Sequence, residues 1–306
     1  MARVDNLENF LTDVASAIKE KKGDNTPIPA SNFDTEISEI PSGKYAPRYI
    51  SFAGCEEYDL DKEIANLDTS NITRMYQMFS MCRNLTRLDV TKFKTEKVIT
   101  MQNMFASCKM LTELDVSNFN TSNVVNMGFM FSYCEKIGEL DVTKFNTENV
   151  TNMNAMFNAC KKLTELDVSN FVTTNVTDMA SMFYDCCLIT VLDLSGFDFS
   201  KVTNINNMLG YAEKLIELSF GTNLGKGYTQ KSANYSNYKL DLSKCKKLTH
   251  DSLMSVINNL YDLNLTYDIA NGGTLYRQQL VLGSTNLAKL TADEIAIATN
   301  KGWNVS

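Results

Sequence analysis

The fold is decided by the stretch Met75-Tyr76-Gln77-Met78-Phe79-Ser80-Met81-Cys82, followed closely by Leu88-Asp89-Val90, because both return every 26 residues. The Met-Phe pair recurs at Met104-Phe105, Met130-Phe131, Met156-Phe157 and Met182-Phe183. Columns of Cys, Asp and Phe follow the same step without insertion. A fixed period over five units predicts stacked repeats, since one such unit is too short to bury its own apolar residues.

Each unit combines two periodicities. In Leu114-Asp115-Val116 the apolar residues alternate with an acid, which is typical of a strand with one face inward. Met127, Met130, Phe131 and Cys134 follow the spacing i, i+3, i+4, i+7 of a short helix. One parallel strand and one short helical segment per 26 residues predict an α/β fold of the leucine-rich-repeat solenoid class.

Composition and charge narrow the class of partner. The 306 residues carry 29 Lys+Arg against 36 Asp+Glu, a net charge of −7, so the chain lacks the basic footprint of a nucleic-acid-binding protein. No apolar run approaches the roughly 20 residues that span a bilayer. The N-terminus has no apolar core typical of a signal peptide. We therefore expect no nucleic acid, no membrane span and folding in the cytoplasm.

The N-terminal residues 1–43 are predicted to form a helical hairpin. An amphipathic helix over residues 5–22 ends near Gly23, and a shorter helix carrying Phe33 and Ile37 ends before Pro41. The apolar face would suit either a structural cap on the repeats or an attachment and oligomerisation module. We predict the second role, with self-association as a further expected contact.

The remaining chain divides into two predicted parts. Residues 44–262 form the repeat solenoid, regular over about 67–220 and interrupted by an insertion at about 221–237 that is rich in Gly, Ser, Asn and Tyr. Residues 263–306 form an α/β C-terminal cap. The expected elements are a strand at 240–243, a helix from the N-cap Thr249 through Leu260, a strand at 275–282, a helix opened by the capping box Thr291–Glu294, and a strand at 303–305.

The residues that could carry chemistry are better interpreted as structural. The cysteine column lacks any Cys-x-x-Cys pair and falls on the Met-Phe stripe, so we expect buried, reduced thiols. His250 is the only histidine, and we expect it to be a polar residue at a helix start. With no base to activate a nucleophile and no phosphate-loop or zinc motif, the sequence predicts no enzyme, no cofactor and no metal site.

The binding-surface candidates are outward-facing residues. The first set is the aspartate column, comprising Asp89, Asp115, Asp141, Asp167 and Asp193; the second is Glu113, Glu139 and Glu165; the third is Tyr228, Tyr235 and Tyr238 of the insertion. Each Asp precedes a Ser or Thr by two residues, which favours a hydrogen-bonded turn. The alternative is a cation ladder or a receptor contact.

The stretch 115–131 resembles the BspA-like leucine-rich repeats, and the resemblance covers most of residues 67–220. Residues 9–33 resemble the N-terminal module of tail-associated proteins from phages of Gram-positive bacteria, and residues 287–303 resemble the C-terminal cap of repeat proteins in those phages. The resemblance implies a non-catalytic virion protein, assembled in the host cytoplasm. Its partners would be a bacterial surface protein or glycan and, through the N-terminal helices, other virion proteins. The alternatives are a bacterial surface adhesin and a cytosolic scaffold made from a prophage.

Overall fold

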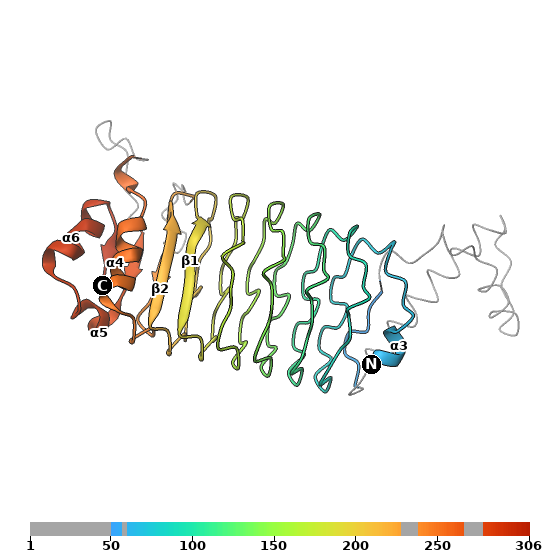
Figure 1. Ribbon diagram of the computed structural model, residues 1–306. Helices are drawn as coiled ribbons and strands as arrows, with labels where there is room; N and C mark the ends of the chain where they lie inside the picture. The colour runs from blue at the N-terminus through green and yellow to red at the C-terminus, as the bar shows by residue number, and fades with distance from the viewer. Residues whose placement is uncertain (1–49, 57–59, 228–237, 266–277) are drawn as a thin grey trace, which may run out of the picture.

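The computed structural model describes residues 50–56, 60–227, 238–265 and 278–306. They form an elongated row of coils with a cluster of helices and strands at one end and the short helix α3 (Asp61–Ile64) near the other (Figure 1). We call the described residues up to 227 the coil stack and those from 238 onward the C-terminal cap. The predicted hairpin of residues 1–43 lies outside the described residues, as do Tyr228 and Tyr235.

Parallel pairing between residues 26 apart holds the coils in register. Single bridges follow one column along the stack: Arg74 to Thr100, Thr100 to Asn126, Asn126 to Asn152, Asn152 to Asp178, and Asp178 to Asn204. In the last coils the pairing extends into regular strands, β1 (Val191–Asp198) and β2 (Glu217–Thr222), where Leu192 pairs with Leu218. We propose that this stack is a leucine-rich-repeat solenoid.

The segment predicted as a short helix consists of turns instead. Phe129 and Tyr133 both have φ of 59°, in the left-handed region. The amides of Phe129 and Phe131 donate to carbonyls of the next coil at 2.7 and 2.9 Å, whereas the amides of Met130 and Ser132 close turns within their own coil at 3.2 and 3.1 Å. The helical prediction was wrong because every second amide points along the stack, which interrupts a helical hydrogen-bond ladder.

The predicted core residues are buried. Six phenylalanine rings, one per coil, stack face to face with centroids 5.5–5.8 Å apart and planes within 9° of parallel; they are Phe52, Phe79, Phe105, Phe131, Phe157 and Phe183. The methionine just before each ring from Phe79 onward is almost fully buried. Each aromatic pair contributes about 0.5–1.5 kcal/mol beyond the burial of its area. The aromatic column therefore runs along the axis of the stack.

A buried polar column, which the sequence analysis did not single out, ties each coil to the next. Its members are Thr69, Thr95, Thr121, Thr147 and Thr173. The Thr147 hydroxyl donates to the Val172 carbonyl at 3.0 Å and accepts the Val172 amide at 2.7 Å. One side chain thereby satisfies both backbone groups of a residue in the neighbouring coil.

The C-terminal cap closes the stack with a three-stranded parallel sheet in the order β3-β4-β5. Its elements are β3 (Lys239–Asp241), α4 (His250–Asn259), η2 (Leu263–Leu265), β4 (Gln279–Val281), α5 (Gly283–Leu287), α6 (Ala292–Asn300) and β5 (Asn304–Val305). Ser252 and Ser255 of α4 accept the amides of Leu218 and Phe220 at 2.9 and 3.0 Å. These two bonds protect the edge of the last coil, which would otherwise expose unpaired strand amides.

The helix starts predicted in the cap are confirmed. The Thr249 side chain accepts the Ser252 amide at the start of α4, and Thr291 and Glu294 form the capping box of α6. The predicted boundary at residue 262 falls inside this unit, because β3 pairs with β4. The insertion was predicted to start too early: Gly221 belongs to β2, and a Cβ there would lie 1.8 Å from the Phe197 carbonyl oxygen.

We expect Thr147→Val to lower the free energy of unfolding by about 1–3 kcal/mol, because it leaves both backbone groups of Val172 without their partner. Thermal unfolding followed by circular dichroism measures the change. Thr151→Val is the matched control, since Thr151 is exposed and the preceding coil already carries Val125 at that position. Equal destabilisation by the two variants would contradict the structural role of the buried threonine column.

Candidate functional site

The aspartate column is built into turns. Each carboxylate accepts the amide of the residue two positions on, at 3.0 Å for Asp89 and at 2.9 Å for Asp115, Asp141, Asp167 and Asp193. The Thr143 hydroxyl adds a second bond to Asp141 at 2.6 Å. These bonds are the turn contacts that the Asp-x-Ser/Thr pattern predicts, and that interpretation is confirmed.

The same hydrogen bonds favour the charged carboxylates. The side-chain and backbone bonds from Thr91 hold the pKa of Asp89 below its usual value, and bonds from Ser117, Thr143 and Ser169 lower the pKa of the next three aspartates of the column. In residues 50–56, 60–227, 238–265 and 278–306, no three His, Cys, Asp or Glu side chains are grouped so as to hold a metal ion. The column is thus a charged, exposed row whose side chains are oriented by their own turns.

The glutamate row lies beside the aspartate column. Glu113, Glu139 and Glu165 are exposed at equivalent positions of three successive coils, and each lies two residues before its aspartate. Arg87 occupies the same position one coil earlier and forms an ion pair with Asp61. We call the exposed rows of Glu113 and Asp115 and their equivalents the aspartate face; it is continuous and acidic over three coils.

Tyr238 does not belong to an exposed surface, and its prediction as a binding residue was wrong. Its side chain is buried, and its ring meets the buried ring of Trp303 edge-on with centroids 6.3 Å apart. Burial raises the pKa of its hydroxyl group. A tyrosine directly before the short strand β3 packs into the core of the C-terminal cap, whereas its neighbours in sequence suggested a polar loop.

The cysteine column is a second buried ladder. The thiols of Cys82, Cys108, Cys134, Cys160 and Cys186 donate to phenylalanine carbonyls of the preceding coil at 3.1–3.3 Å. Burial raises the pKa of Cys108 and of Cys160 to about 12. Such thiols remain protonated at neutral pH, and the expectation of buried, reduced cysteines is confirmed for this column.

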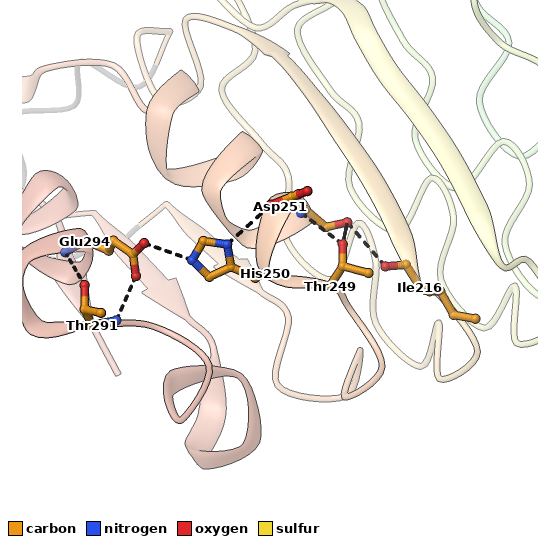
Figure 2. Close-up of polar contacts among 7 residues, drawn as sticks. Ile216, Thr249, His250, Asp251, Thr291 and Glu294 are labelled. Atoms are coloured by element: carbon orange, nitrogen blue, oxygen red, sulfur yellow. Dashed lines mark hydrogen bonds and ion pairs between the residues drawn. The ribbon is translucent and has the colours of Figure 1, made fainter.

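His250 connects two helices of the C-terminal cap (Figure 2). Its Nε2 lies 2.9 Å from Oε1 of Glu294 in α6, and its Nδ1 lies 3.4 Å from Asp251. The hydrogen bond with Glu294 raises the pKa of the imidazole. The nearby Ser252 hydroxyl contacts Thr249 and the Ile216 carbonyl instead of the ring. The arrangement is an ion-pair latch, as expected for a polar residue at a helix start.

A row of alternating charges on the opposite side of each coil was missed by the sequence analysis. Lys109 pairs with Glu135 at 2.9 Å, and Lys161 lies 3.6 Å from both Glu135 and Asp185. Lys109, Glu135 and Lys161 are 26 residues apart, so their alternation was visible in the aligned repeats. We call this side, formed by residues 73–84 and their equivalents in later coils, the turn face.

The repeats identify the family of this chain. The model of the family described as "Mycoplasma protein of unknown function, DUF285" matches residues 49–139 and 112–223, which together make up more than half of the chain. The chain belongs to the DUF285 family. A search of curated proteins and a search of solved structures found no match. None of the helices described for this DUF285 protein is long and apolar enough to cross a membrane.

We expect the thiols of this DUF285 protein to differ sharply in reactivity. Iodoacetamide at pH 8 should modify the half-buried Cys187 within minutes, while Cys108, Cys134 and Cys160 react only after denaturant is added, because buried thiols with a raised pKa are not nucleophilic. Peptide mass spectrometry after timed quenching measures each site. Modification of Cys134 in the native protein as fast as of Cys187 would overturn its place in the core.

The His250 latch predicts a pH dependence of the cap. Because the folded-state pKa of His250 is raised, its contribution to stability is fully present below the ordinary value of about 6.5 and is lost as pH rises through the raised value. His250→Gln should lower the melting temperature at pH 5.5 and leave it nearly unchanged at pH 9. The capping box of Glu294 is retained in this variant, so an equal effect at both pH values would contradict the charged latch.

Proposed function

We propose that this DUF285 protein is a non-catalytic, tail-associated phage virion protein that binds the bacterial host surface through its coil stack. The observation that carries the proposal is the division of each coil into a uniform interior and a varied exterior. Inward columns repeat Met, Phe, Cys and Thr, whereas neighbouring outward positions change from coil to coil. Stacked repeats with this division present extended binding surfaces.

Rigidity supports a binding role. The hydrogen bonds between coils and the stacked phenylalanine column hold outward side chains at fixed spacing along the stack. A surface that is ordered before binding loses little conformational entropy when a partner docks. The aspartate face would therefore act as a preformed acidic strip that recognises a partner carrying complementary positive charge or hydroxyl donors.

The reactive side chains that are described have structural partners, which supports a non-catalytic role. The column thiols donate to backbone carbonyls in the core, and both ring nitrogens of His250 face carboxylates. A histidine held in this way has no nucleophile to activate. The assignment to a virion rests on the resemblance of residues 9–33 and 287–303 to phage tail proteins, with the N-terminal helices as the proposed attachment to other virion proteins.

A second candidate, a bacterial surface adhesin, is favoured by the family description, which names mycoplasmas. The coil stack would present the same face in either setting. Immunoblots of purified phage particles and of the cell envelope separate the two: the virion proposal expects the chain in particles that sediment with tails, and the adhesin proposal expects it in the envelope of uninfected cells.

We expect the triple variant Glu113→Lys, Glu139→Lys and Glu165→Lys to bind host cells at least about tenfold more weakly than the natural protein. The three changes invert the charge of the aspartate face without altering a buried side chain, so each should shift stability by no more than about 0.5 kcal/mol. Adsorption of the fluorescently labelled protein to cells, together with the melting temperature, measures both effects.

The matched control reverses three exposed glutamates elsewhere on the surface, in Glu96→Lys, Glu148→Lys and Glu213→Lys. It changes the net charge equally, so a loss of adsorption confined to the first variant assigns binding to the aspartate face. Equal adsorption of the first variant and the natural protein would remove this face from the binding site.

A further inference from the structure

An open groove of about 770 Å³ crosses three successive coils on the turn face. Arg74 and Tyr76 line it from the first coil, Ile99 and Gln102 from the second, and Val125 and Asn126 from the third. With neighbouring coils about 4.8 Å apart, the groove extends roughly 10 Å along the stack. Its long direction therefore follows the axis of the repeats.

The apolar side chains of this groove are not required by the fold. Ile99 and Val125 are 44% and 43% exposed, and equivalent positions of other coils hold Thr73, Thr151, Thr177 and Thr203. The backbone bond at this position is the same with either residue type, since the amides of Val125 and Thr177 each donate to the preceding coil at 2.9 and 2.8 Å. Apolar residues grouped at a solvent-exposed position without a structural need indicate a contact surface.

Polar groups surround this apolar floor. The Asn126 amide donates to the Gln102 side-chain oxygen at 3.1 Å, and its own oxygen accepts the Gly128 amide at 2.9 Å, so the two side chains are held in place. The Arg74 guanidinium has no ion pair among the described residues, whereas Lys109 and Lys161 of the same face pair with carboxylates. The groove thus combines an unpaired cation, oriented amides and an exposed tyrosine ring.

The backbone of the groove is already satisfied. The amide of Ile99 donates to the Thr73 carbonyl at 2.8 Å, and the Ile99 carbonyl accepts the Val125 amide at 2.9 Å. An extended peptide therefore finds no open strand edge along this row on which to add main-chain hydrogen bonds. A single unpaired cation on a chain of net charge −7 is also too little for a nucleic acid backbone.

We propose that the groove binds an acidic oligosaccharide that lies along the stack. The Tyr76 ring and the side chains of Ile99 and Val125 would cover the C–H face of a sugar ring, the amides of Gln102 and Asn126 would bind hydroxyl groups, and Arg74 would pair with a carboxylate or a phosphate. The inference rests on the proposed function, because it names the chemistry of a ligand on the bacterial surface, and it locates the ligand away from the aspartate face.

Isothermal titration of the full-length protein tests the proposal with four probes. They are a galacturonic acid tetrasaccharide, a glycerol phosphate oligomer, a neutral cello-oligosaccharide and a tetraglutamate peptide. We expect one of the two acidic polymers that carry hydroxyl groups to bind most tightly, and which of them does so identifies carboxylate or phosphate as the anion. Arg74→Gln should weaken that binding at least about tenfold. Arg83→Gln, which removes an exposed arginine outside the groove, should leave it unchanged.

A double variant tests the apolar floor. Ile99→Thr with Val125→Thr gives the groove the residues of the other coils, so it should weaken binding about tenfold without changing the melting temperature. Binding of tetraglutamate or of the neutral sugar as tight as that of the acidic sugars would overturn the proposal, as would affinities that neither groove variant changes. If natural protein adsorbs to host cells and the groove variants adsorb equally, the groove inference fails while the proposed function stands.

Discussion

The structure depends on backbone hydrogen bonds between residues about 26 positions apart. On the turn face the amides of Met101 and Phe105 donate to Asn126 and Met130 of the next coil at 3.0 and 2.9 Å. An isolated coil would leave every second amide of this segment unpaired, at a cost of about 1–3 kcal/mol for each buried group. The stack is therefore cooperative, and its last coil needs the serines of α4 to complete the pattern.

This constraint also divides the surface into required and variable positions. The interior columns and the turn aspartates serve every coil in the same way, so their repetition carries little information about a ligand. Ile99, Val125 and Tyr76 depart from the residues that suffice elsewhere in the same column. Comparison of coils within one chain thus separates the fold from the features that the fold does not need, and it places the two proposed binding regions on different faces.

Only part of the candidate site was predictable from sequence. The turn role of Asp115 follows from a local pattern, because the bond spans two residues. The buried role of Tyr238 does not, because its partner Trp303 lies 65 residues away in the sequence and meets it only in the folded cap. The groove was missed for a similar reason: Arg74, Gln102 and Asn126 come from three coils, and neither their grouping nor the missing ion pair of Arg74 is a property of one segment.

The sequence by itself determined the period, the buried columns and the caps of α4 and α6, because each follows from spacing within a single repeat or a single helix turn. Only the tertiary structure decided whether the stripe of Met127, Met130, Phe131 and Cys134 would be helix or turns. The spacing i, i+3, i+4, i+7 buries the same residues in both cases. The choice depends on where the remaining amides find acceptors, and here those acceptors are carbonyls of the neighbouring coil.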